Sequence, residues 1–137
     1  MSPSVLLVDD SVEICASIEE MLRFKSAYAH GLLIERTHSV HGALGFLHES
    51  RFGVVVVDYR LSDGVGSEVV RKARDCCAET LVIGMSADDS RSVREDMTNA
   101  GVNHFFPKVN LAGLVTTVCV HCATHLDGET DGVPSTQ

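Results

Sequence analysis

The sequence lacks a hydrophobic run long enough to cross a membrane. A membrane-spanning helix needs roughly 20 consecutive apolar residues, and the longest apolar stretches in this chain fall far short of that length. The N-terminus also lacks the pattern of a secretory signal. These two absences predict a cytoplasmic protein with no membrane partner.

Positive charge is scarce as well. The 137 residues include 11 Lys and Arg against 19 Asp and Glu, which gives a net charge of −8. Nucleic acids and anionic membranes are themselves negative, so we do not expect this chain to bind either of them directly. The excess of acidic side chains is compatible with a cation-binding site or with a basic partner.

The cysteines show no disulfide pattern. There are five of them, an odd number, in a chain without a secretion signal, which indicates reduced thiols. Cys119 and Cys122 fall on the apolar face of a predicted helix, and His125 lies about 120° around that helix from Cys119. The three side chains therefore do not converge, and we interpret the two thiols, like Cys76 and Cys77, as packing residues.

Short apolar runs alternate along the chain with segments of helical periodicity. The chain is long enough for one domain with a core of its own, which we place at residues 1–126, followed by a flexible polar tail at 127–137. Strands are expected at residues 4–9, 31–37, 54–58, 80–86 and 103–108, each followed by a helix. This alternation indicates an α/β fold with a parallel sheet covered by helices on both faces.

Some helix boundaries can also be placed. Ser11 can cap the first helix, and the second helix is expected to end near Gly53. Gly101 can end the fourth helix in a left-handed conformation. Residues 59–66, between the third strand and the third helix, are expected to form a loop.

Polar residues follow the predicted strands. Asp9 and Asp10 follow the first strand, Asp58 the third, Ser86 the fourth and Lys108 the fifth. The carboxyl ends of parallel strands share one edge of the sheet, and α/β folds place their sites there. Three crowded carboxylates repel one another and raise each other's pKa. A divalent cation relieves this repulsion, and Mg²⁺, or alternatively Mn²⁺, suits a site of few carboxylates, water and a phosphate oxygen.

This set of residues predicts phosphoryl transfer, which needs positioning and charge neutralisation more than covalent machinery. The nucleophile is expected to be a carboxylate, because no cysteine or histidine ends a predicted strand at this edge. Asp58 is the best candidate, since it follows the most apolar strand and has acidic and basic neighbours on both sides.

At these positions the chain resembles the response-regulator receiver domain of two-component signalling, the CheY-like family. The resemblance runs from about Ser4 to Leu126 and includes the segments DYRLSDGVG, GMSA and AGVNHFFPK. The family has an acidic pair, a phospho-accepting aspartate, a serine or threonine and a lysine after its first, third, fourth and fifth strands. The resemblance implies a doubly wound, flavodoxin-like sheet of five parallel strands in the order 2-1-3-4-5, flanked by five helices.

The resemblance also implies a mechanism. Asp9, Asp10 and Asp58 would hold Mg²⁺ together with the backbone carbonyl of Arg60. Asp58 would accept a phosphoryl group from a histidine kinase or a histidine phosphotransfer protein, while the metal and Lys108 neutralise charge. The protein would then be a signalling switch limited to self-catalysed phosphorylation and dephosphorylation, not an enzyme.

By the same resemblance, phosphorylation would shift the protein between two conformations. Ser86 would move to bond a phosphoryl oxygen, and Phe105 occupies the place of the family's aromatic switch residue. The fourth helix, fifth strand and fifth helix would form the surface that binds a downstream protein or a second copy of the chain.

The sequence departs from the family pattern at a few positions. Val109 replaces the usual proline after the lysine, and a cis bond before a non-proline residue costs roughly 2.5–4 kcal/mol. We therefore expect either a strained Lys108–Val109 bond or a trans bond in a rearranged loop that loosens the placement of Lys108. Ser62 replaces a frequent proline, which predicts a more mobile loop, and Phe105 lacks the hydroxyl of the more usual tyrosine.

Other functions remain open at this point. The chain could be a pseudo-receiver, which keeps the fold as an interaction module without the chemistry, or the receiver fragment of a larger regulator or hybrid kinase. A phosphatase of the haloacid-dehalogenase type is a further alternative. Such enzymes have a nucleophile on the first strand and a second aspartate two residues later, and the segment VDDSVE lacks that spacing.

Overall fold

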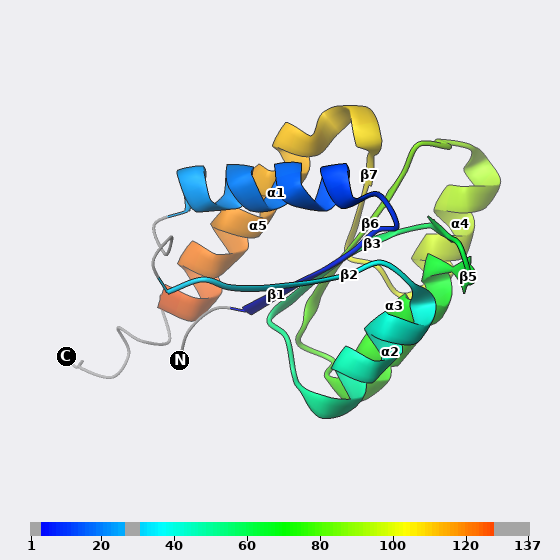
Figure 1. Ribbon diagram of the computed structural model, residues 1–137, viewed down its shortest axis with the longest axis horizontal. Coiled ribbons are helices and arrows are strands. Elements are labelled where there is room, and N and C mark those ends of the chain that lie inside the picture. Colours follow the sequence, from blue (N-terminus) through cyan, green and yellow to red (C-terminus); the bar gives the residue numbers. More distant parts are fainter. Residues whose placement is uncertain (1–3, 27–30, 128–137) are drawn as a thin grey trace.

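The computed structural model describes residues 4–26 and 31–127 (Figure 1). Asp127 is therefore the only residue of the predicted tail that it includes. The strands are β1 (Ser4–Val8), β2 (Leu33–Thr37), β3 (Val54–Asp58), β4 (Arg60–Leu61), β5 (Gly64–Val65), β6 (Leu81–Ser86) and β7 (His104–Pro107). The helices are α1 (Val12–Lys25), α2 (Val40–Glu49), α3 (Gly66–Cys76), α4 (Arg91–Ala100) and α5 (Leu111–His121). A 3₁₀ turn at Lys108–Asn110 precedes α5, and a π-helical segment at Cys122–Asp127 follows it.

Five of the strands form one parallel sheet in the order β2-β1-β3-β6-β7. The strands β4 and β5 pair with each other in a separate antiparallel ribbon. Counted without this ribbon, the sheet has the predicted order 2-1-3-4-5, so the predicted fold class is confirmed. The order places β1, β3 and β6 inside the sheet, where neighbouring strands satisfy their backbone groups on both sides.

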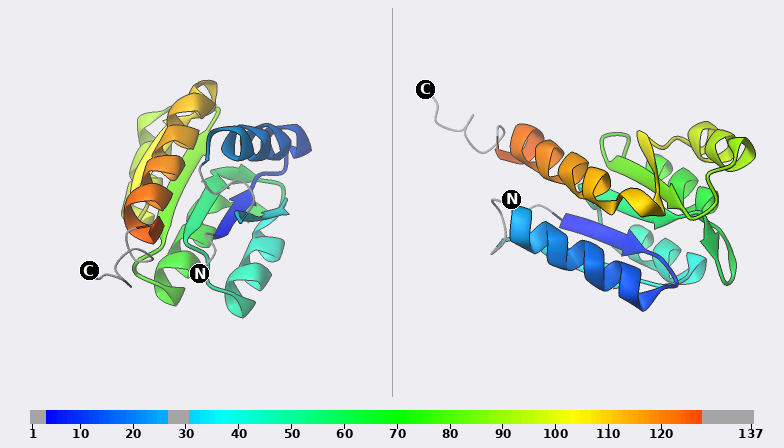
Figure 2. Two further views of the ribbon diagram at one scale, coloured as in Figure 1. Left: turned by 90° about the vertical axis from the view of Figure 1, so that its left-hand side faces the viewer. Right: turned by 90° about the horizontal axis from the view of Figure 1, so that it is seen from above.

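Two hydrophobic cores lie on opposite faces of this sheet. Alternate residues of β3 serve the two cores: Val54 and Val56 belong to one, and Val55 and Val57 to the other. The helices α1 and α5 cover the first face, while α2, α3 and α4 cover the second (Figure 1, Figure 2). The four-valine run is fully buried because helices cover both faces of a central strand.

The predicted helix boundaries hold at two positions and fail at one. The hydroxyl of Ser11 accepts a hydrogen bond from the Ile14 amide at the start of α1, and Gly101 ends α4 with φ at 118°. The second helix ends at Glu49, short of the predicted position near Gly53. An extended residue after Glu49 stops the helix, and the chain then runs to β3.

The segment at residues 59–66 is more regular than a loop, because it contains the β4–β5 ribbon. The ribbon is attached to α2 through Asp63. Its carboxylate oxygens accept hydrogen bonds from the backbone amides of Val40, at 2.7 Å, and His41, at 3.0 Å. These bonds lower the pKa of Asp63 and satisfy two of the free amides at the helix start.

The cysteines are free thiols, as predicted. Cys15 and Cys122 are buried in the core, and burial raises the pKa of each thiol to about 11. Cys119 packs against the same core, whereas the side chain of His125 lies outside the described part of the structure. Cys77 does not pack within α3 but caps its end.

A single arginine joins three segments at the far end of the sheet from the carboxyl edge. The Nε of Arg74 donates to the Gly101 carbonyl at 2.7 Å, which holds the end of α4. One terminal nitrogen donates to the carbonyls of Thr80, at 2.7 Å, and Ala78, at 3.2 Å, while the other bonds Asn103. Arg74 therefore provides hydrogen-bond donors for three backbone carbonyls outside the regular helices and strands.

We expect Arg74→Ala to lower the free energy of unfolding by about 2 kcal/mol, because several hydrogen bonds to one charged group are lost together. Arg71→Ala is the matched control on the same helix. Arg71 makes a longer ion pair, 3.6 Å from Asp96, and such an exposed pair is worth under about 1 kcal/mol. Urea denaturation of both variants measures the difference, and equal losses would contradict the role given to Arg74.

Within residues 4–26 and 31–127, no helix is both long and apolar enough to span a membrane.

Candidate functional site

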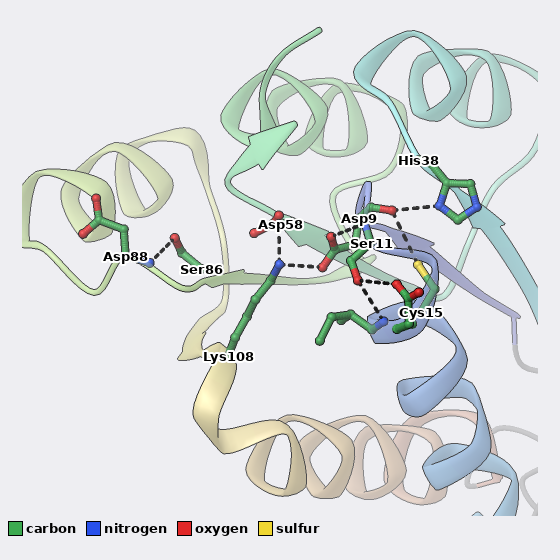
Figure 3. Close-up of polar contacts among 10 residues, drawn as sticks. Asp9, Ser11, Cys15, His38, Asp58, Ser86, Asp88 and Lys108 are labelled. Atoms are coloured by element: carbon green, nitrogen blue, oxygen red, sulfur yellow. Dashed lines mark hydrogen bonds and ion pairs between the residues drawn. The ribbon is translucent and has the colours of Figure 1, made fainter. Parts of the chain in front are cut away.

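The residues singled out in the sequence meet at the carboxyl edge of the sheet (Figure 3). Asp9 comes directly after β1, Asp58 ends β3, Ser86 ends β6, and Lys108 comes directly after β7. Parallel pairing brings the ends of these strands side by side. The site is therefore a product of the sheet order, because Lys108 contacts Asp58, 50 positions earlier in the chain, and also Asp9, which is earlier still.

Three aspartates form an acidic cluster at the centre of this edge. Carboxylate oxygens of Asp9, Asp10 and Asp58 lie within 4.8 Å of one another. Asp9 is fully buried and Asp58 is 4% exposed, whereas Asp10 is exposed to solvent. Oxygen ligands from few carboxylates, open to water on one side, are the donor set that a hard divalent cation prefers.

Lys108 is the cation that faces this cluster (Figure 3). Its Nζ donates a hydrogen bond to Asp58 Oδ2 at 3.1 Å and lies 2.9 Å from Asp9 Oδ2. The contact with Asp9 is an ion pair that is not aligned as a hydrogen bond, so this buried oxygen lacks a hydrogen-bond partner among the described residues. The lysine thus leaves one buried oxygen of Asp9 without a hydrogen bond, and a bound cation would fit this position.

The electrostatics of the cluster match this geometry. Burial, followed by the neighbouring charge of Asp9, raises the pKa of Asp58 to about 6, although Lys108 opposes the shift. Burial alone would lower the pKa of Lys108, but the carboxylates of Asp9 and Asp58 outweigh it and raise that pKa above its usual value. The fold therefore disfavours the charged form of Asp58.

The Lys108–Val109 bond is trans, since residues 4–26 and 31–127 contain no cis peptide bond. This is the second of the two alternatives considered above. The bond lies in the 3₁₀ turn Lys108–Asn110, and the Val109 side chain is 95% exposed. Lys108 nevertheless reaches both buried carboxylates, so the structure does not show the looser placement that we expected for this alternative.

Ser86 lies in the site but faces away from the carboxylates. It is buried, and its Oγ accepts a hydrogen bond from the Asp88 amide at 3.0 Å (Figure 3). Phe105 is half-buried against the second core, and the guanidinium carbon of Arg94 lies 4.8 Å from its ring centroid. Their roles as switch residues stay predictions.

Arg60, whose backbone carbonyl is the predicted additional metal ligand, begins the ribbon two residues after Asp58. Its side chain reaches the loop between β6 and α4, where its guanidinium lies 3.0 Å from Asp88 Oδ2. The role of its carbonyl stays a prediction.

Two residues that support the site escaped the sequence analysis. A Cβ atom on Gly66 would lie 2.1 Å from the backbone oxygen of Asp58, so only glycine fits there. The spacing of this glycine after Asp58 was a usable signal. The ring Nδ1 of His38 lies 2.8 Å from the carbonyl oxygen of Asp9, a contact that no pattern in the sequence indicated.

Comparisons with known proteins agree with this architecture. The response regulator MprA of Mycobacterium bovis is 29% identical over 108 residues, which make up 79% of this chain and 45% of the relative. The chain thus spans about half the length of the curated relatives it matches.

Solved structures show the same fold. A two-component response regulator from Clostridium difficile aligns with a TM-score of 0.77 at 20% identity, over 89% of this chain and 97% of that one. A CheY-like receiver domain protein from Methanospirillum hungatei aligns with a TM-score of 0.76 at 24% identity, over 86% and 91%.

The family assignment rests on the sequence itself. The model of the response regulator receiver domain matches residues 5–118, a range that begins in β1, ends in α5 and includes the whole acidic cluster and Lys108. The chain belongs to the response regulator receiver domain family.

Proposed function

We propose that this protein is a phosphorylation-controlled switch in which Asp58 accepts a phosphoryl group. The observation that carries the proposal is the position of Lys108 Nζ, within 3.1 Å of a carboxylate oxygen of both Asp9 and Asp58. A lysine in this place can neutralise a phosphoryl oxygen beside the reacting carboxylate, and phosphoryl transfer depends mainly on such positioning and neutralisation.

We propose Asp9, Asp10, Asp58 and the Arg60 carbonyl as the ligands of Mg²⁺, or alternatively Mn²⁺. The lack of a hydrogen-bond partner for Asp9 Oδ2 and the cluster of carboxylates support this assignment. When bound, the ion would supply charge neutralisation for phosphoryl oxygens. Because a bound cation also favours the ionised form of Asp58, it would make this carboxylate available as a nucleophile near neutral pH.

The proposed transfer needs the residues of this site, a bound divalent cation and a phosphodonor. An oxygen of the Asp58 carboxylate forms a bond to phosphorus, while the bond between phosphorus and a histidine nitrogen of the donor breaks. The electron pair of that bond returns to the imidazole. The proposed donor is a histidine kinase or a histidine phosphotransfer protein, and water later hydrolyses the aspartyl phosphate.

The proposed output is a change in binding. Ser86 would turn to a phosphoryl oxygen, and α4, β7 and α5 would present the surface for a downstream protein or a second copy of the chain. Phe105 lies on β7 and contacts Arg94 of α4, so it can respond to a movement of either element. We place this signalling activity in the cytoplasm.

The direct test is incubation with acetyl phosphate and Mg²⁺, followed by intact-mass measurement. We expect the wild-type protein to gain one phosphoryl group, Asp58→Asn to gain none, and the wild type with a chelator to gain none. Asp75→Asn, at an exposed position of α3, is the matched control and should behave as wild type. An unmodified wild-type mass would support a pseudo-receiver instead, and labelling of Asp58→Asn would place the acceptor elsewhere.

A further inference from the structure

The loop between β6 and α4 is attached to the phospho-acceptor segment through Asp88. One carboxylate oxygen of Asp88 contacts the guanidinium of Arg60 at 3.0 Å, and the other accepts a hydrogen bond from the Ser90 amide at 2.9 Å. The backbone amide of Asp88 donates to Ser86 Oγ at 3.0 Å. The orientation of Asp88 is therefore fixed from three sides, and Arg60 is the partner that comes from outside the loop.

These contacts determine where the Ser86 hydroxyl points. It is nearly inaccessible to solvent, at 1% exposure, and it faces the Asp88 amide rather than the carboxylates (Figure 3). In the proposed function Ser86 must instead bond a phosphoryl oxygen on Asp58. Because its Oγ is directed at the Asp88 amide, the side chain has to turn toward Asp58, and this turn would strain or break the bond to the amide (Figure 3). Anything that stabilises this bond therefore opposes the switch.

A phosphoryl group on Asp58 would weaken the ion pair between Arg60 and Asp88 through its negative charge. Arg60 lies two residues from Asp58, and a phosphoryl group there would carry nearly two negative charges in place of the single charge of the carboxylate. Arginine binds phosphoryl oxygens strongly through paired hydrogen bonds, so the guanidinium would be drawn from Asp88 to the new group. The Asp88 carboxylate would be repelled by the same charge, and both effects would release the loop.

We propose that Arg60 and Asp88 form a positioning pair that holds the Ser86 hydroxyl away from Asp58 until a phosphoryl group takes over the guanidinium. The inference rests on the proposed function of Asp58. The two side chains are 66% and 40% exposed, so the contribution of the pair is modest. Exposed ion pairs of this kind change an equilibrium by less than about fivefold.

The first experiment measures the affinity for beryllofluoride, a phosphoryl mimic, in the presence of Mg²⁺. Asp88→Asn should tighten binding by about twofold to fivefold, because asparagine keeps the bond to Ser90 but loses the ion pair. The same substitution in the R60Q background should give a clearly smaller gain. A gain of equal size in both backgrounds would overturn the pairing, since Asp88 would then act by its charge alone.

The second experiment needs neither metal nor phosphate. Hydrogen exchange of the Asp88 amide should be faster in R60Q, by up to about fivefold, and should return to the wild-type rate in R60K. Arg91→Gln, which breaks an exposed ion pair with Glu95 on α4, is the matched control and should leave that amide unchanged. An Asp88 amide that exchanges equally in wild type and R60Q would overturn the inference, whatever beryllofluoride does. If the wild type binds no beryllofluoride, the proposed function fails, and the exchange rates alone decide whether the pair exists.

Discussion

Replacing Gly66 with alanine is expected to destabilise the protein by about 3 kcal/mol or more and to disturb Asp58, the proposed acceptor. The added methyl carbon would lie 2.1 Å from the backbone oxygen of Asp58 and 3.0 Å from a Val57 methyl. Backbone atoms at the end of a central strand cannot move aside as the tip of a flexible side chain can. Either β3 or the start of α3 must shift, and both hold the site.

The matched control for this prediction is Gly45→Ala. Gly45 lies inside α2, and a Cβ atom there would have no neighbour within 4 Å. Alanine should therefore stabilise the protein by up to about 1 kcal/mol, which is the usual preference for alanine over glycine within a helix. Denaturant unfolding of both variants gives the comparison. Similar effects of the two substitutions would show that the close approach at Gly66 relaxes easily.

Asp58→Asn is expected to make the metal-free protein more stable, although it removes the proposed acceptor. The pKa of Asp58 is raised from 3.8 to about 6, so its ionised form is less favourable in the folded state than in the unfolded chain. A shift of this size corresponds to a penalty on the order of 2–3 kcal/mol at neutral pH. Asparagine has nearly the same shape and carries no charge to be buried.

The pH dependence of this difference has a definite sign. Between pH 3.8 and about 6 the folded state keeps the Asp58 proton that the unfolded chain has already lost. Stability due to this group therefore falls as the pH rises through that window, and it is constant above it. The gap between Asp58→Asn and wild type should be near zero at the acidic end of the window and full at pH 7.

Thermal or urea unfolding from pH 4 to pH 7, without divalent ions, would measure this gap. Carboxylates that do not interact with Asp58 contribute equally to both proteins, so the difference between the two curves reports Asp58 together with the neighbours coupled to it. Mg²⁺ should then stabilise the wild type and leave Asp58→Asn nearly unchanged. A gap that does not vary with pH would contradict burial and repulsion as its cause.

The sheet and the location of the site could be predicted because they follow from coarse patterns. Short apolar runs that alternate with helical periods dictate a parallel sheet, and the sheet brings Asp9, Asp58, Ser86 and Lys108 to one edge. The end of α4 could be predicted equally well, because Gly101 adopts a left-handed conformation that other residues rarely take.

Contacts between side chains and loops could not be predicted in this way. The β4–β5 ribbon is two residues long on each strand, too short to produce a period, and the end of α2 depends on one extended residue. The ion pair between Arg60 and Asp88 joins two exposed residues that are 28 positions apart. Hydrophobic periodicity carries no information about which exposed side chains will meet. The direction of the Ser86 hydroxyl depends on that same loop.

The attachment of Asp63 to α2 has a consequence for protein engineering. The carboxylate that completes the start of α2 belongs to the segment after β3, more than 20 positions later in the chain. A chimaera that imports residues 59–66 from another receiver therefore also exchanges the cap of a helix outside the transplant. A graft that preserves an aspartate at position 63 keeps the hydrogen bonds to the first amides of α2. A graft without it must provide another hydrogen-bond acceptor for those amides.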